Sequence, residues 1–125
     1  MTDTKLTFKE MCAKFDVTPR TLRYYEYIEL LQPERDGRSR FYHPREIARM
    51  ELIMRGRRFG FSLEDIRQWL DLYNTEHQNQ AQMTAWIRLA DTQLDELNSR
   101  KRQLDEAINE LQQLRDQVQD DLSKT

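Results

Sequence analysis

The sequence contains few of the residues on which metal proteins and disulfide-stapled proteins depend. Among its 125 residues there are one Cys, two His, three Gly and three Pro. A single Cys excludes an internal disulfide and fits a reducing cytoplasm. His43 and His77 lie far apart and have no further ligand at the spacing of a metal site. We therefore expect no metal and no cofactor.

Long apolar runs and catalytic constellations are also missing. No apolar stretch reaches about 18 residues, so the sequence predicts no membrane span. The first residues, MTDTKLTFKE, lack the apolar region of a signal peptide. There is no Ser/His/Asp, Cys/His or paired-carboxylate arrangement. We expect a cytoplasmic protein that is not an enzyme.

Charge is distributed unevenly along the chain, whose net charge is only −2. Residues 1–70 carry 14 Lys and Arg against 11 Asp and Glu, whereas residues 71–125 carry 6 against 11. A basic half with interleaved aromatic residues can meet an anionic polymer, and an acidic half would repel one. The two halves therefore have different partners.

Capping signals predict two short helices joined by a tight turn. Thr7-x-x-Glu10 is a capping box, and Thr18 followed by Pro19 is an N-cap with proline at the first helical position. This spacing predicts a helix-turn-helix. On the second helix, Leu22 lies on the apolar side, and a basic and aromatic face lies opposite or beside it. That face consists of Arg20, Thr21, Arg23, Tyr24 and Tyr27.

The next segment predicts a hairpin and two further helices. Asp36-Gly37 is a dipeptide preferred in two-residue hairpin turns, and Arg35, Arg38 and Arg40 decorate this hairpin. A third helix begins at Pro44 and ends at Gly60, with an apolar stripe. Ser62-x-x-Asp65 caps a fourth helix. The stripe of the third helix is Ile47, Met50 and Met54, and the inward face of the fourth is Leu63, Ile66, Leu70 and Tyr73.

The last third of the chain carries a heptad seam, which predicts a coiled-coil dimer. Two seam positions are charged, Lys101 and Arg115. A parallel dimer would stack each charge on its own copy, whereas an antiparallel dimer places both opposite apolar positions, so we expect an antiparallel homodimer. The apolar seam positions are Met83, Ile87, Ala90, Leu94, Leu97, Leu104, Ile108, Leu111, Val118 and Leu122.

Three blocks of the sequence resemble the MerR family of transcriptional regulators. They are TPRTLRYYEYIELLQPER, RFYHPREIARM and RGRRFGFSLEDIRQWL, and they occur in the family's order over about residues 6–73. The resemblance implies a mainly α fold. It comprises a winged helix-turn-helix head at residues 1–73, a joint at 74–82 and a dimerisation helix at 83–125.

The same resemblance implies the function. In this family the second helix enters the major groove, the wing grips phosphates, and the dimer binds a two-fold-symmetric promoter site and shortens an overlong spacer for RNA polymerase. It implies a bacterial, nucleoid-associated protein whose small-molecule effector, if any, is unnamed. It implies DNA contacts from Arg20, Thr21, Arg23 and Tyr24 on the helix, and from Arg38, Arg40 and Tyr42 on the wing.

The chain also departs from the family's pattern. His43 stands where a Ser, Thr or Asp cap is usual before the third helix. Metal-sensing members carry Cys around the dimerisation helix, and this chain has none there. Residues 52–74 are similar to members that control branched-chain amino-acid and isovalerate breakdown.

Several alternatives stand beside these interpretations. A DNA-bending architectural or excisionase-like protein would share the winged helix without acting on a polymerase. Cys12 occupies an apolar helix position, which favours a packing role. Arg49 and Arg67 are interpreted as solvated surface residues. Trp69 and Trp86 bracket the joint, where packing is favoured over a ligand pocket.

Overall fold

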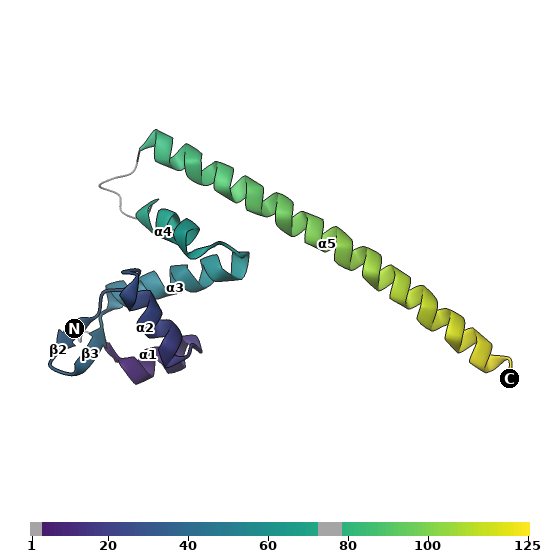
Figure 1. Cartoon of the computed structure of the whole chain (residues 1–125), viewed down its shortest axis with the longest axis horizontal. Helices are drawn as coiled ribbons and strands as arrows, with labels where there is room; N and C mark the ends of the chain where they lie inside the picture. The colour runs from purple at the N-terminus through teal and green to yellow at the C-terminus, as the bar shows by residue number, and fades with distance from the viewer. Residues whose placement is uncertain (1–3, 73–78) are drawn as a thin grey trace. The chain divides into compact units, whose positions relative to one another are not determined.

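The computed structural model describes residues 4–72 and 79–125 of the chain (Figure 1). They fall into two compact units, Met1–Trp86 and Ile87–Thr125. We call the first unit the head and the second the coil segment. The predicted fold class is confirmed: the chain is mainly helical, with a small β-wing in the head and a long C-terminal helix. The elements are β1 (Leu6–Thr7), α1 (Phe8–Phe15), α2 (Pro19–Tyr27), β2 (Glu34–Asp36), β3 (Ser39–Tyr42), α3 (Pro44–Phe59), α4 (Leu63–Leu72) and α5 (Gln80–Ser123).

Local capping bonds fix the helix-turn-helix as predicted. The Glu10 backbone N–H donates to Thr7 Oγ1 at 3.2 Å, and the Thr7 N–H donates to Glu10 Oε1 at 2.9 Å. Thr18 Oγ1 accepts from the Thr21 N–H at 3.1 Å, with Pro19 in the first turn of α2. Between the two helices Asp16 adopts a left-handed conformation with φ 52°. The turn is therefore only three residues long.

The wing belongs to a three-stranded antiparallel sheet in the order β1-β3-β2. Asp36 pairs with Ser39, so the two-residue turn is Gly37-Arg38, and the predicted Asp36-Gly37 turn is wrong by one residue. Gly37 has φ 63°, and a positive φ at the first central position is typical of a type II′ turn. The correction places Arg38 at the tip of the wing.

Among its described residues, the head closes around twelve buried apolar side chains from its helices, β3 and the connecting segments. Met50 is fully buried as predicted, and the fully buried Ile53 on α3 was not part of the predicted stripe. Gly56 permits a close approach of α3 to α4, because a Cβ there would lie 2.7 Å from Ile66 Cγ1. The buried set is Met11, Leu22, Tyr25, Leu30, Leu31, Tyr42, Met50, Ile53, Phe61, Ile66, Trp69 and Leu70.

The ends of α3 and α4 follow the sequence signals. His43 occupies the N-cap of α3 without a side-chain capping bond, as its residue type predicted. Gly60 ends α3 in the left-handed region with φ 88°. Ser62 Oγ accepts from the Asp65 N–H at 3.1 Å, and Asp65 Oδ2 accepts from the Ser62 N–H at 3.3 Å, which confirms the predicted cap of α4.

The coil segment is a single helix with no buried residue. Its large apolar seam residues are exposed by between 36% at Leu97 and 68% at Leu111. At the start of α5, the Gln82 N–H donates to Asn79 Oδ1 at 2.7 Å. Residues 74–78 of the predicted joint, and Tyr73 of the predicted α4 face, lie outside the described residues. Within the described ranges, no helix is both long and apolar enough to cross a membrane.

Candidate nucleic-acid interface

We call α2 the recognition helix. Its outward face carries the predicted contact residues of this helix. Leu22 and Tyr25 are buried beneath it, and Arg20, Arg23 and Tyr24 are exposed. Thr21 is half-buried, and its hydroxyl accepts a hydrogen bond from the Thr18 hydroxyl at 3.0 Å. The helix therefore presents two guanidinium groups and a phenol on one side while its other side belongs to the core.

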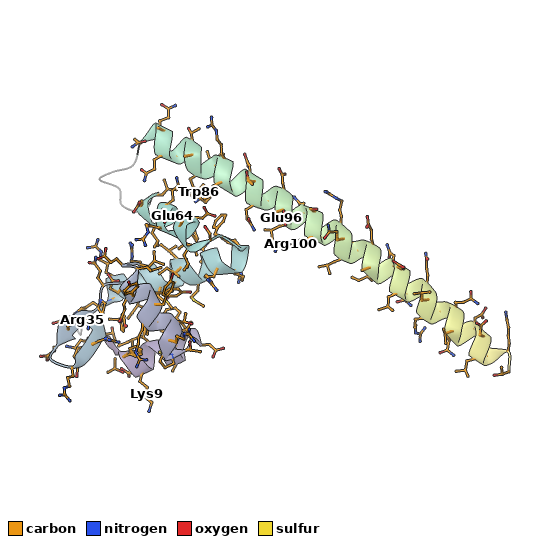
Figure 2. The ribbon with its side chains drawn as sticks, viewed as in Figure 1. Lys9, Arg35, Glu64, Trp86, Glu96 and Arg100 are labelled. Carbon is orange, nitrogen blue, oxygen red and sulfur yellow. The ribbon has the colours of Figure 1, made fainter. Side chains whose placement is uncertain are left out.

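A cleft of about 380 Å³ joins the recognition helix to the wing and to α1. Its lining contains four cationic side chains and no acidic one, so it is suited to an anion. Lys9, on α1, is directed outward from the head in Figure 2, and sequence reasoning did not assign it to DNA. The lining residues are Thr7, Phe8, Lys9, Arg23, Arg38, Ser39, Arg40 and Phe41.

A second cleft, of about 580 Å³, lies on the other side of the recognition helix. Arg20, Thr21, Arg23 and Tyr24 line it, together with Arg57 from the last turn of α3. Helical periodicity puts Arg57 outside the apolar stripe of its helix and gives it no further role. Its position beside the recognition helix adds it to the candidate interface, and no local pattern could have singled it out from Arg55 and Arg58.

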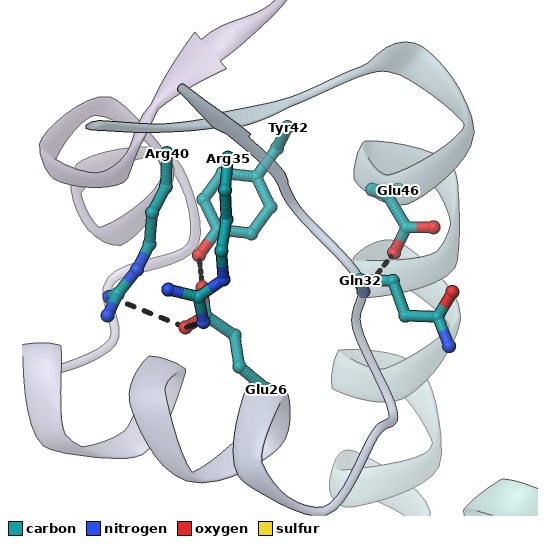
Figure 3. A network of polar contacts seen from close by, with 6 residues as sticks. All are labelled: Glu26, Gln32, Arg35, Arg40, Tyr42 and Glu46. Carbon is teal, nitrogen blue, oxygen red and sulfur yellow. Dashed lines mark hydrogen bonds and ion pairs between the residues drawn. The ribbon is translucent and has the colours of Figure 1, made fainter. Parts of the chain in front are cut away.

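A carboxylate on the recognition helix ties the wing to it (Figure 3). The Glu26 side chain is only 6% exposed. Its Oε1 lies 3.4 Å from Arg40 Nη1 and 4.0 Å from Arg35 Nη2, and its Oε2 accepts a hydrogen bond from the Tyr42 hydroxyl. A carboxylate with three such partners on one wing fixes the angle between the wing and the recognition helix.

The structure corrects the assignment of Tyr42 to the DNA-contacting set. Its side chain is fully buried, and its hydroxyl is directed to Glu26 rather than to the surface. Burial, followed by the hydrogen bond to Glu26, raises the pKa of the Tyr42 phenol far above its ordinary value. The phenol therefore keeps its proton and its hydrogen bond at neutral pH, and Tyr42 positions the wing from within.

Arg49 and Arg67 were interpreted as solvated surface residues, and the structure overturns that interpretation. Arg49 Nε donates to the Leu30 carbonyl, and Arg67 Nη2 donates to the Ile28 carbonyl, each at 2.5 Å. Both bonds are part-buried and join α3 and α4 to the segment that follows the recognition helix. We call this pair the arginine tethers. The Ile28 carbonyl, at the C-cap of the recognition helix, is one that a helix end leaves without an intrahelical partner.

Two further contacts support the base of the wing. The Gln32 N–H donates to Glu46 Oε2 at 3.0 Å, which connects the segment before β2 to α3 (Figure 3). His43 Nε2 contacts the carboxylate of Glu34 on β2. Arg38, at the wing tip, is exposed, and Arg40 is half-buried. The wing is thus anchored at its base, and it carries Arg38 at its tip and Arg40 on β3.

Residues with metal-binding chemistry do not gather in the described part of the chain. No group of three or more His, Cys, Asp or Glu side chains there is arranged to hold a metal ion. Cys12 on α1 is half-buried, and burial raises the pKa of its thiol. A raised thiol pKa disfavours the thiolate that binds metals and reacts with electrophiles.

The fold and this basic face match a known family. The family model described as MerR HTH family regulatory protein matches residues 6–72, and the one described as MerR, DNA binding matches residues 47–120. The chain belongs to the MerR family. It is accordingly a DNA-binding transcriptional regulator, not an enzyme.

Individual MerR-type proteins are similar along most of the chain. An uncharacterized HTH-type transcriptional regulator of Pseudomonas aeruginosa is 36% identical, over 89% of this chain and 78% of the relative. The HTH-type transcriptional regulator ZntR of Escherichia coli is 31% identical, over 86% and 76%. The crystal structure of HiNmlR, a MerR family regulator lacking the sensor domain, bound to promoter DNA, shares the fold with a TM-score of 0.65 at 18% identity, covering 85% and 80%.

Proposed function

We propose that this MerR-family regulator binds its promoter as a homodimer joined through the coil segment. The observation that carries the proposal is the exposed seam: eight apolar side chains recur at heptad spacing on a helix that buries nothing itself. Removing such a stripe from water is favourable in proportion to its area, so a second copy of the same helix is a suitable cover. The eight are Ile87, Leu94, Leu97, Leu104, Ile108, Leu111, Val118 and Leu122.

The two helices of this dimer run antiparallel in our proposal. The charged seam residues Lys101 and Arg115 would repel their own copies in a parallel pair, and both are exposed on the isolated helix. An antiparallel arrangement places each opposite apolar positions, along which their long stems can pack. Such a dimer carries its two heads at opposite ends of the coil.

On DNA, the recognition helices of this dimer enter major grooves on the same face of the duplex. Arg20, Arg23 and Tyr24 are exposed for contacts in the groove, and Arg can pair with guanine in two hydrogen bonds. In this proposal Arg38, Arg40 and Arg57 contact phosphates, which is supported by their positions in the linings of the two clefts beside the recognition helix. Two-fold symmetry sets the half-sites about one helical turn, or a multiple of it, apart.

Transcription is switched by deforming the DNA between the half-sites. Bending a site of about 20–30 base pairs by about 40–90° costs on the order of 1–6 kcal/mol, which several charge-assisted phosphate contacts can offset. The site lies in the spacer between the −35 and −10 elements, and the deformation brings both elements within reach of RNA polymerase.

The test is to shorten the spacer of the bound promoter by one or two base pairs. Transcription should then be high without the protein, as measured by in vitro transcription with purified polymerase. Continued dependence of the shortened promoter on the protein, or a binding site outside the spacer, would instead favour simple repression or an architectural, excisionase-like role.

The genes under control are a separate part of the proposal. Residues 52–74 are similar to regulators of branched-chain amino-acid and isovalerate breakdown, and this remains a prediction with no support from the relatives named above. Mapping the chromosomal sites bound in the cell tests it, along with the expected association with the nucleoid. Sites beside unrelated genes would refute it.

A further inference from the structure

We infer that Phe8 is a positioning residue that joins Arg23 of the recognition helix and Arg40 of the wing into one unit for binding the DNA backbone. The inference deepens the proposed function and rests on it. Phe8 is the first residue of α1, a helix to which the sequence assigned no part in DNA binding. Both guanidinium groups gather at its ring, in the cleft whose charged lining is wholly basic.

The geometry at Phe8 is that of two cation–π pairs sharing one ring. The guanidinium carbon of Arg23 lies 5.3 Å from the ring centroid, and that of Arg40 lies 5.1 Å from it. Both distances are within the roughly 6 Å at which a guanidinium interacts favourably with an aromatic face. The two guanidinium groups repel each other because both are positively charged. Attraction to the electron-rich ring offsets this repulsion and keeps both groups close to Phe8.

Glu26 holds the same unit from the other end. Its carboxylate lies 3.4 Å from Arg40 Nη1, so Arg40 has both an aromatic and an anionic partner. The Arg40 side chain is 25% exposed, which leaves part of its guanidinium accessible. Arg23 has only the ring among the contacts described, and it is exposed. The ring thus connects a firmly held cation on the wing to a freer one on the recognition helix.

The consequence for binding is pre-organisation. A long Arg side chain loses rotamer freedom when it contacts a phosphate, and that loss weakens binding. A ring that already holds both guanidinium groups reduces the loss for each of them. The contacts of the wing and of the recognition helix are then coupled, so the loss of one weakens the other.

The first test is a double-mutant cycle on promoter binding, measured by fluorescence anisotropy at two salt concentrations. Phe8→Leu keeps an apolar side chain and removes the aromatic face. We expect it to lower affinity about fivefold in the unmodified background and less than about twofold in the Arg23→Ala/Arg40→Ala background. Phe8→Tyr should restore the affinity. A fivefold loss in both backgrounds, or no loss in either, overturns the inference.

The second test does not depend on how well Phe8→Leu folds. Replacing Phe8 by mono-, di- and trifluorinated phenylalanine keeps the shape of the ring while progressively weakening its negative face. Affinity for the promoter should fall stepwise along the series. Phe61, which packs against the rings of Phe59 and Trp69 in the core, is the matched control position and should give no such trend.

The outcomes separate the inference from the proposed function. If the unmodified protein fails to bind the promoter spacer, the proposed function is wrong. If the unmodified protein binds and the fluorinated series at Phe8 is flat, only the inference is wrong.

Discussion

The head and the coil segment use apolar residues in opposite ways. Twelve are buried among the described residues of the head, and the coil segment buries none although its seam repeats over nearly its whole length. The head reverses direction at left-handed residues such as Asp16 and Gly60, so its helices cover one another. Helix α5 continues for 44 residues without a turn and cannot fold onto itself. The comparison teaches that apolar patterning needs turns to become a core within one chain.

The largest effect should come from placing charges in the apolar seam of the coil segment. We predict that Leu97→Asp together with Ile108→Asp converts the dimer to monomers, because each carboxylate would have to be desolvated in the coil interface. Promoter affinity should fall by about 100-fold or more, since two linked heads bind far more tightly than one. Multi-angle light scattering and anisotropy titration measure the two effects.

The matched control places the same charges away from the seam. Ser99→Asp together with Gln113→Asp puts two carboxylates on the opposite face of the heptad and should leave both mass and affinity nearly unchanged. A dimeric seam variant, or a monomeric unmodified protein, contradicts the prediction.

In the head, the next largest effect should come from adding a side chain where α3 and α4 pack closely at Gly56. We predict that Gly56→Ala destabilises the head by about 1–3 kcal/mol, although Ala is the better helix former, because the added Cβ would lie 2.7 Å from Ile66 Cγ1. Urea unfolding followed by the fluorescence of the buried Trp69 measures the change. The Gly56→Ala/Ile66→Ala double variant should lose less stability than the sum of the losses of the two single variants. An unchanged or raised urea midpoint for Gly56→Ala would show that the contact relaxes freely.

Alkaline pH should destabilise the head and not the coil segment, because the head contains the buried phenol of Tyr42 and residues 87–125 contain no Tyr. The pKa of Tyr42 is raised in the folded state by burial and by Glu26. Above about pH 10 the unfolded chain releases this proton and the folded chain keeps it, so the free energy of unfolding falls by up to about 1.4 kcal/mol per pH unit. Tyr42→Phe should remove that slope, and Tyr24→Phe, at an exposed position, should retain it. Equal slopes for all three proteins would contradict the assignment.

The smallest expected change in stability concerns the turn at Glu29 in the head. Glu29 follows the recognition helix with φ 64°, a region that non-glycine residues occupy at a cost. We predict that Glu29→Gly raises the stability of the head by about 1 kcal/mol or less, measured by thermal unfolding. Glu51→Gly, on the exposed side of α3, is the control and should lower stability by about 1 kcal/mol. Destabilisation by Glu29→Gly would mean that the Glu side chain has a structural role of its own.

Sequence reasoning located the features that depend on near neighbours. Thr7, Thr18 and Ser62 cap helices through bonds to residues three positions away, so a short window contains all the participants. Gly60 ends α3 because of its own backbone freedom. The outward placement of Arg20, Arg23 and Tyr24 followed from helical periodicity alone.

Features that depend on distant partners were missed. The acceptors of Arg49 and Arg67 are backbone carbonyls 19 and 39 residues away, which no residue pattern marks. The hairpin turn lies one residue after its predicted position, because Gly37 can occupy either central position of a two-residue turn. In the observed register, β3 pairs with both β1 and β2. Tyr42 resembles a surface aromatic in sequence, and only the position of Glu26 shows that its hydroxyl is directed inward.

The arginine tethers have a consequence for re-engineering the DNA sequence that this regulator reads. Arg49 and Arg67 hold backbone carbonyls, which are chemically the same whichever residue carries them. The exposed side of the recognition helix takes no part in these bonds or in the core. A library that varies positions 20, 24 and 27 can therefore explore new operator sequences on a helix whose orientation is held by groups that the variation does not touch.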